Sequence, residues 1–376
     1  MIERIKHMLI KEFIQIFRDP RMKGVIFLMP VIQLLVFGYA VTTDVKHVAT
    51  AIYDLDNSVV SRELVARFVE SGYFDIAAYA ANPTQVRELI DRGDVRTVLQ
   101  MNKGFEDDLR AGRSATLQLI VDGTDSNTAG IVLNYSAKIA GEFSQKVLAK
   151  RFSRLKGSAA APATVKLQTR AWFNENLESR NFYVPGVIAI IVMLITLMLT
   201  SMAVVREKEI GTMEQIMVTP ITPAEFILGK TIPFALIGFA DVVLITVLGV
   251  FWFEVPIRGS LLMLFVATAL YLMTTLGVGL LISTVSETQQ QAMMSTFFFY
   301  FPAVLLSGFM FPIANMPAII QWLTYLNPLR YFLVIVRGIF LKGVGPVVLW
   351  PQMAALALMG LVVLWLASSR FKKTLA

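Results

Sequence analysis

Long apolar runs separated by short polar segments are the dominant pattern of this chain. A helix that spans the hydrocarbon core of a membrane needs about 20 consecutive, mostly apolar residues. The first run lacks a small-residue cleavage site of the A-x-A type, so we expect it to be retained rather than removed as a signal peptide. Six runs meet the length requirement, and we predict a transmembrane helix in each: 24–42, 183–205, 231–253, 260–284, 292–311 and 347–368.

The segment between the first two runs alternates strand and helix patterns instead. Short apolar stretches of high β-propensity are followed by turns rich in Asp, Asn and Gly, and Asn82-Pro83 is a helix-start signal. This alternation is typical of a compact α/β domain. We predict strands at 48–53, 95–99, 117–121 and 165–172, and helices at 59–69, directly after Asn82, and at 131–152.

Together these patterns predict an α-helical membrane protein with six transmembrane helices. An α/β extracytoplasmic domain is inserted between helices 1 and 2, and a re-entrant segment lies between helices 5 and 6. The predicted layout is a cytoplasmic amphipathic helix at 1–23, transmembrane helix 1 at 24–43, the extracytoplasmic domain at 44–181, and transmembrane helices 2–6 within 182–376.

The positive charge of the chain is concentrated beside the apolar runs. Residues 44–180 contain 18 Lys/Arg and 17 Asp/Glu, a net of +1, so +6 of the total +7 lies elsewhere. Basic residues precede the first run and follow the last one, which by the positive-inside rule places both termini in the cytoplasm. The basic composition therefore indicates topology and contact with anionic membrane lipids, and we do not expect a nucleic-acid partner.

Composition also excludes several kinds of chemistry. The chain has no cysteine and only two histidines, His7 and His47, so we expect neither a disulfide nor a metal or catalytic site in it. Gly229-Lys230-Thr231 resembles the end of a phosphate-binding loop, but Ala224 stands where that loop needs glycine. We therefore expect Lys230 to reach the inner membrane interface, and any ATP to be bound by a partner subunit.

A polar island, 206–230, separates the second and third runs. Ile210, Met213 and Met217 follow one stripe of a helix, with acidic residues on its other sides. Thr219-Pro220 would end this helix, because a residue before proline leaves the helical region. Thr222 and Glu225 form the capping-box pattern that begins the next helix. We predict a short amphipathic helix at 206–218 that lies along the membrane face and receives a push from a soluble partner.

The stretch 306–342 is apolar but rich in proline. Pro312, Pro317 and Pro328 prevent one continuous helix, while the composition is too apolar for an ordinary loop. We predict a re-entrant segment at 312–342, in which Asn327-Pro328 and Arg330 lie near the outer face. Arg330 would there pair with an acid or reach lipid headgroups.

Asp241 is the one acid deep within a predicted span. It lies about 16 Å along the helix axis from Lys230, at about 1.5 Å per residue, which is near the middle of the bilayer. A charge there is costly, so such residues often serve transport. Two interpretations remain open: a site coupled to substrate or protons, and a structural acid that is neutral or paired with a neighbouring helix.

The sequences of 206–230 and 307–343 resemble the type-2 ABC exporter permeases, and the resemblance covers essentially the whole chain. The large external domain resembles the bacterial drug-exporter-like subgroup. The resemblance implies that 206–218 is a coupling helix, which docks into a separate ABC ATPase subunit, and that the amphipathic N-terminal helix is the connecting helix beside it. The implied coupling residues are Glu207, Glu209, Ile210, Thr212, Met213, Glu214 and Met217.

The same resemblance implies two permease subunits, identical or paralogous, with two ATPases in a bacterial inner membrane. The chain itself would be no enzyme and hold no cofactor. It would move a small amphiphilic or drug-like substrate outward by alternating access. The rival hypothesis is a membrane-anchored scaffold or receptor whose external domain binds a ligand without transport. That hypothesis does not explain an amphipathic helix between the second and third spans.

Overall fold

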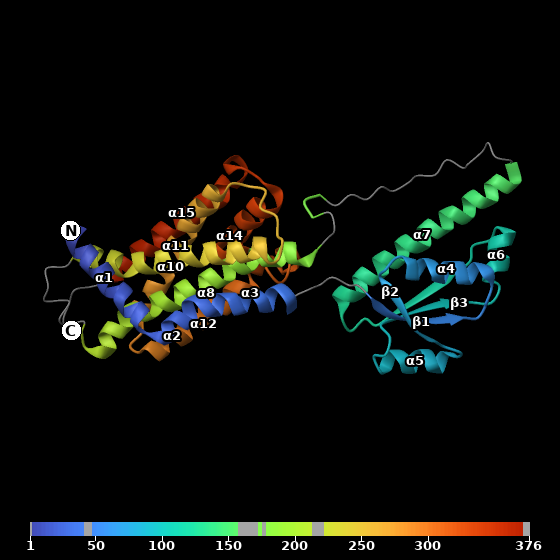
Figure 1. The fold of residues 1–376 in the computed structure, drawn as a ribbon, viewed down its shortest axis with the longest axis horizontal. Coiled ribbons are helices and arrows are strands. Elements are labelled where there is room, and N and C mark those ends of the chain that lie inside the picture. The colour runs from blue at the N-terminus through green and yellow to red at the C-terminus, as the bar shows by residue number, and fades with distance from the viewer. Residues whose placement is uncertain (1, 41–46, 157–171, 175–177, 213–221, 371–376) are drawn as a thin grey trace. The chain divides into compact units, whose positions relative to one another are not determined.

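The computed structural model describes residues 2–40, 47–156, 172–174, 178–212 and 222–370. The chain divides into two compact units, Met1–Thr42 with Ala171–Ala376 and Thr43–Arg170, which are best described separately. The first is a bundle of apolar helices and the second contains a four-stranded sheet. Figure 1 labels the elements of both units.

The helical unit begins with an amphipathic helix and continues with apolar ones. Four of its helices are long and apolar enough to cross a membrane: Ser179–Ile210, Glu225–Phe251, Leu261–Val285 and Pro346–Ser369. The elements are α1 Ile2–Arg18, α2 Pro20–Lys23, η1 Gly24–Leu28, α3 Met29–Ala40, α8 Ser179–Ile210, α10 Pro223–Phe251, α11 Leu261–Val285, α12 Gln289–Leu305, η2 Ile313–Asn315, α13 Ala318–Leu323, η3 Thr324–Leu326, α14 Pro328–Arg337, η4 Gly338–Lys342 and α15 Pro346–Arg370.

A fifth span arises if the bent pair Ala318–Leu326 and Pro328–Lys342 counts as one, so the structure supports four or five spans and does not confirm six. The first predicted run gives a shorter apolar helix, Gly24–Tyr39, which opens with the π-helical turn η1. The fifth gives α12, with 17 residues. That helix ends before Gly308, whose φ of +82° is a left-handed conformation incompatible with continuing the helix.

Helix α8 forms the centre of the helical unit. It is apolar all round and packs against α3, α10, α11, α12 and α14, as expected for a helix buried within a bundle. Small and hydroxyl-bearing residues let α11 approach it closely: Thr196 Oγ1 donates to Thr275 Oγ1 at 3.0 Å. A Cβ built at Gly279 would lie 2.8 Å from the Thr200 Cβ and 3.2 Å from the Leu197 carbonyl oxygen. These small and hydroxyl-bearing residues therefore serve helix packing.

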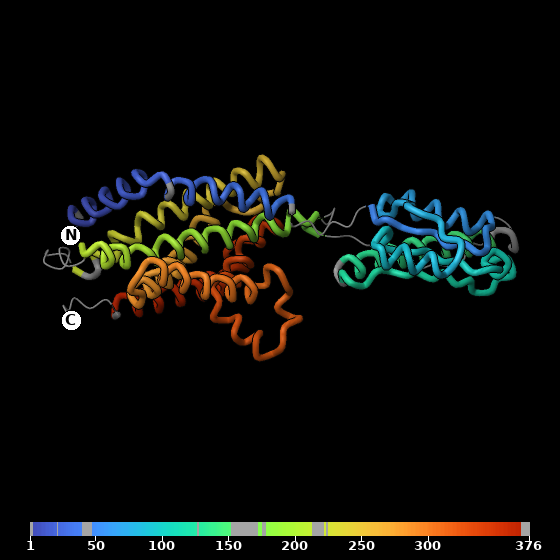
Figure 2. Tube along the Cα trace, turned by 90° about the horizontal axis from the view of Figure 1, so that it is seen from below, coloured from blue at the N-terminus to red at the C-terminus, as the bar shows by residue number. Residues whose placement is uncertain are grey.

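One end of this bundle gathers elements that are far apart in sequence. Figures 1 and 2 show the start of α1, the end of α8, the start of α10 and the end of α15 at the same end. A small apolar cluster joins them, made of Met8, Val204, Phe226, Leu280 and Ala367. The polar segment between α8 and α10 therefore leaves and re-enters the bundle at this end.

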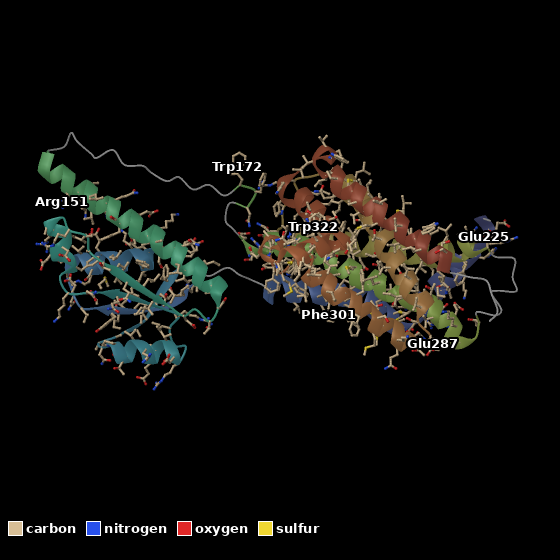
Figure 3. All side chains as sticks on the ribbon, turned by 180° about the vertical axis from the view of Figure 1, so that it is seen from behind. Arg151, Trp172, Glu225, Glu287, Phe301 and Trp322 are labelled. Carbon is tan, nitrogen blue, oxygen red and sulfur yellow. The ribbon has the colours of Figure 1, made fainter. Side chains whose placement is uncertain are left out.

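The opposite end carries the bent pair, whose two helical parts meet at Asn327 at an angle of 82°. The Asn327 side chain holds the bend: its Oδ1 accepts from the Leu329 N–H at 3.1 Å, and its Nδ2 donates to the Ala303 carbonyl at 2.6 Å. Helix α14 is buried, whereas α13 exposes Ile319 and Trp322. In Figure 3, Trp322 lies at one end of the helical unit, and Glu225 and Glu287 lie towards the other.

The second unit is a mixed sheet with helices on both faces. Its strand order is β2-β1-β3-β4, with β1 parallel to β2 and β3 and with β4 antiparallel to β3. Helices α4, α6 and α7 cover one face and α5 the other (Figure 1). The elements are β1 Val48–Asp54, α4 Val59–Glu70, β2 Phe74–Tyr79, α5 Pro83–Asp91, β3 Thr97–Met101, α6 Phe105–Ala111, β4 Leu117–Val121 and α7 Ser126–Lys156.

Local rules account for most of this sheet. The predicted helix start at Asn82 is confirmed, because its side chain accepts from the Gln85 N–H and Pro83 occupies the first turn. Strand β2 was not predicted, and its residues alternate between buried and exposed along one edge of the sheet. The strand predicted at 165–172 lies almost entirely outside the described residues.

Candidate functional site

The site is built on the way α1 lies against α10. Met8, Glu12 and Ile16 recur every four residues, which places them on one face of α1, and all three are buried. The opposing surface of α10 is open at Gly229, where an added Cβ would lie only 2.5 Å from the Met8 sulfur. This close approach brings the acidic side chain of Glu12 over the start of α10.

Four charged side chains meet there, from α1, α8 and α10. The ammonium group of Lys230 lies 2.6 Å from Glu12 Oε1 and 2.7 Å from Glu207 Oε1. Lys230 is 1% exposed, and the two glutamates are 3% exposed. Lys11 adds a second ammonium 2.9 Å from Glu207 Oε1 and 3.9 Å from Glu12 Oε1. We call Lys11, Glu12, Glu207 and Lys230 the buried charge cluster.

The cluster balances two carboxylates against two ammonium groups. Removing a charge from water costs several kcal/mol, and only a close partner of opposite sign offsets that cost. Each buried charge here has such a partner, so the three elements are held in one arrangement. The hydroxyl of Thr212 also donates to the Glu207 carboxylate. Gly211, with a φ of +80°, ends α8 and turns the chain so that Thr212 folds back.

The start of α10 is fixed in a similar way. The predicted capping box is confirmed: the Thr222 N–H donates to Glu225 Oε2 at 2.8 Å, and the Glu225 N–H donates to Thr222 Oγ1 at 3.2 Å. Arg4 of α1 lies 3.7 Å from the same Glu225 carboxylate. Both flanks of the polar segment are therefore attached to α1, one through Lys11 and the other through Arg4.

The predicted coupling residues fall into three groups. Glu207 faces the interior of the bundle with Thr212 bonded to it, whereas Glu209 and Ile210 are exposed at the end of α8. Residues 206–210 are the last turn of α8, continuous with the span, and Gly211 closes that helix. Glu209 Oε2 accepts from Gln289 Nε2 at 2.5 Å, which attaches the start of α12. Met213, Glu214 and Met217 lie outside the described residues.

Lys230 corrects one expectation and reveals two residues that the sequence pattern missed. It does not reach the membrane interface but is buried between Glu12 and Glu207. In the sequence Lys11 counts only among the basic residues that precede the first apolar run, and Glu12 belongs to no predicted pattern. The available signal was Glu12 itself, an acid four residues from both Met8 and Ile16.

Asp241 lies on the buried face of α10 and is 1% exposed. Neither of its carboxylate oxygens has a hydrogen-bond partner among the described residues. The described residues therefore do not supply the neighbouring polar group that a paired structural acid would need.

Among the described residues, the arginines of the bent pair contact local hydroxyl, carbonyl and aromatic groups and no acid. Arg330 donates to the Thr324 hydroxyl and lies with its guanidinium carbon 4.0 Å from the centre of the Tyr325 ring. Arg337 lies 3.7 Å over the Phe182 ring. Pro312 and Pro317 precede η2 and α13, and Pro328 begins α14, so each proline stands where a helix starts.

A bundle of apolar helices, with charged groups buried at one end and a sheet domain inserted in the chain, defines a polytopic membrane protein. The family model for ABC-2 family transporter proteins matches residues 24–368, so the chain belongs to that family. This confirms the resemblance carried by 206–230 and 307–343.

Named relatives extend the match over nearly the whole chain. The probable multidrug ABC transporter permease YbhS of Escherichia coli K12 is 34% identical over 372 residues, covering 98% of this chain and 97% of its own. The probable multidrug ABC transporter permease YbhR of the same organism is 33% identical over 350 residues, 93% of each chain. The inner membrane transport permease YhhJ, also from that organism, is 28% identical, covering 92% of each chain.

ABC-2 permeases are membrane transport subunits that work with a separate ABC ATPase. The chain is accordingly a permease subunit and not an enzyme. This membership decides against the scaffold or receptor hypothesis.

Proposed function

We propose that this permease exports a small amphiphilic or drug-like substrate across a bacterial inner membrane, by alternating access driven by a partner ATPase. The names of YbhR and YbhS, probable multidrug ABC transporter permeases, support this substrate class. In the proposed assembly two permeases, identical or paralogous, work with two ATPases that bind the ATP. Six spans, both termini in the cytoplasm and an external sheet domain complete the arrangement.

One observation carries the proposed coupling mechanism: α1, α8 and α10 are joined at the two flanks of the polar segment by ion pairs whose carboxylates are buried. A force applied to that segment cannot move α8 without α1 and α10, because separating them would leave a buried carboxylate or ammonium without its partner. The segment and the three helices would then move as one lever, which changes the opening of the bundle.

The proposal divides the predicted coupling residues by role. Glu209 and Ile210, exposed at the end of α8, would contact the ATPase, together with Met213, Glu214 and Met217. Glu207 would instead hold the base of the lever from inside the bundle. Substitutions at the exposed residues should therefore lower ATPase stimulation, whereas substitutions at Glu207 should also lower the stability of the permease.

The test compares ATPase stimulation with the stability of the permease. The substitution Glu209→Lys should lower the ATPase rate of the reconstituted complex, and the purified permease should lose no more stability than the exposed hydrogen bond to Gln289 contributes, about 0.5–1.5 kcal/mol. Glu70→Lys, the same charge reversal at an exposed glutamate of α4, is the matched control and should change neither quantity. A normal ATPase rate in Glu209→Lys would remove this surface from the ATPase contact.

We also propose that Asp241 takes part in transport, as a site coupled to substrate or protons. A buried carboxylate without a partner is costly, and such residues in spans commonly serve function. Asp241→Asn should insert normally and change the export rate. Thr246→Val serves as control, because it removes another buried polar group of the same helix that has no hydrogen-bond partner among the described residues. Wild-type export by Asp241→Asn would refute the functional role.

A further inference from the structure

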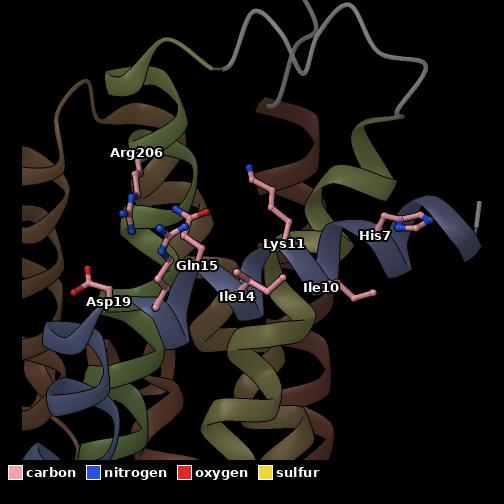
Figure 4. Close-up of a pocket in the computed structure, with 8 residues that line it drawn as sticks. His7, Ile10, Lys11, Ile14, Gln15, Asp19 and Arg206 are labelled. Carbon is pink, nitrogen blue, oxygen red and sulfur yellow. The ribbon is translucent and has the colours of Figure 1, made fainter.

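A groove of about 680 Å³ lies between the exposed side of α1 and the end of α8. Figure 4 shows Arg206 coming from α8 and reaching towards Gln15 on α1, with Lys11 and His7 further along α1. The groove thus lies beside the buried charge cluster, because Lys11 belongs to both.

The polar lining of the groove is mainly basic. Lys11, Arg18 and Arg206 contribute three permanent positive charges, with His7 at one end and Asp19 as the acidic residue. Arg18 and Arg206 have neither an ion pair nor a hydrogen bond within the part of the chain that the structure describes. Two guanidinium groups, each with several unused N–H donors, are suited to binding a phosphate.

The other part of the lining is apolar and continues onto the surface of the bundle. Ile10 and Ile14 line the groove and are 45% and 59% exposed. Phe17 follows on the same side of α1 and stacks on Phe27 of η1 with 6.4 Å between ring centres. From there the exposed apolar side chains continue along α3 at Ile32 and Val36. In a membrane protein such a continuous surface faces acyl chains.

We propose that this groove binds an anionic phospholipid of the inner leaflet. The phosphate would lie among Lys11, Arg18 and Arg206, and one acyl chain would lie along Ile10 and Ile14. An acidic segment of the ATPase would match the basic residues as well. The lipid is favoured because the apolar half of the groove joins the surface that faces acyl chains, where a soluble partner has no counterpart.

Lys11 gives this site a regulatory consequence, which rests on the proposed function. Its side chain is 49% exposed and lies both in the groove and 2.9 Å from Glu207. A bound phosphate would draw the Lys11 ammonium away from the Glu207 carboxylate. Lys230 would then be the main partner of Glu207, and the ion pair between them would become stronger. Anionic lipid should therefore change ATPase coupling through the buried charge cluster.

Lipid binding can be measured on the full permease alone, without the ATPase. The permease is purified in detergent with mixed phosphatidylethanolamine and phosphatidylglycerol, and the phosphatidylglycerol that is retained is determined by native mass spectrometry. We expect the double variant Arg18→Gln/Arg206→Gln to weaken retention roughly 25-fold, because each of the two basic side chains near an anionic headgroup contributes about fivefold. Lys6→Gln/Lys23→Gln removes two charges near the same end of the chain but outside the groove and should retain the lipid.

Equal loss in both double variants would show general attraction to anionic lipid and overturn the site. Unchanged retention in Arg18→Gln/Arg206→Gln would overturn it as well. If this variant instead no longer binds the ATPase subunit in detergent free of phospholipid, the groove is a contact surface for that protein and the lipid proposal fails. These readouts are independent of Glu209→Lys, so failure of the lipid site is distinguishable from failure of the coupling mechanism.

Discussion

Replacing Lys230 by methionine removes the central ammonium of the buried charge cluster at nearly constant side-chain length. Two carboxylates, each 3% exposed, then share the single ammonium of Lys11. That group lies 2.9 Å from Glu207 but 3.9 Å from Glu12, so Glu12 loses its close partner. Breaking a buried pair costs about 3–5 kcal/mol. Because Glu207 keeps Lys11, we expect the lower end of that range, about 3 kcal/mol.

A second substitution tests whether charge balance is the cause. In Glu12→Met/Lys230→Met one carboxylate and one ammonium remain, Glu207 and Lys11, at 2.9 Å. The double variant should therefore be more stable than Lys230→Met by about 1–3 kcal/mol, although it carries one more substitution. Free energies of unfolding are measured by titrating the purified permease with sodium dodecyl sulfate in mixed micelles, with Lys6→Met as the exposed control. Additive losses in the double variant, or wild-type stability of Lys230→Met, would refute the reasoning.

Three further predictions concern packing, pH and topology. Gly279→Leu should destabilise the helical unit by about 1–3 kcal/mol in the same titration, because its Cβ would lie 3.2 Å from the Leu197 carbonyl oxygen. The pKa of Asp56 is lowered by a hydrogen bond from Ser58 and by three backbone N–H groups at the start of α6. The ionised Asp56 carboxylate therefore stabilises the fold above the unfolded pKa of about 3.9, and this contribution is lost as pH falls through the lower folded pKa. In Asp56→Asn the free energy of unfolding should depend less on pH in this acid range, as measured by circular dichroism. Because the chain has no native cysteine, single cysteines at Glu287 and Ile319 should react from opposite sides of the membrane with an impermeant maleimide.

Each of these has a result that would contradict it. Wild-type stability of Gly279→Leu would mean that α8 and α11 are further apart than described. If the stability of Asp56→Asn falls with acid pH as steeply as that of the wild type, the hydrogen bonds to Asp56 do not contribute to stability. Reaction of both cysteines from the same side would remove the proposed placement of the bent pair at the outer face.

Local patterns in the sequence determined much of this protein. Apolar runs located the four long helices, the spacing of Thr222 and Glu225 located the start of α10, and Asn82-Pro83 located α5. Each of these features depends on residues within about one turn of helix or one span, so neighbours in sequence suffice to specify it. The same locality allowed the family to be inferred from two continuous segments.

The tertiary structure alone decided where the charges go. Lys230 and Glu12 are 218 positions apart, and they meet because α1 packs against α10 at Gly229. The residues around Lys230 in the sequence do not show whether its side chain reaches the membrane interface or is buried between two carboxylates. In both cases the lysine stands at the start of a transmembrane helix. Strand β2 likewise became a strand through pairing with β1, and Glu207 turned inward because Lys230 and Lys11 surround it. Such contacts depend on how separate elements pack, which the sequence of each element does not specify.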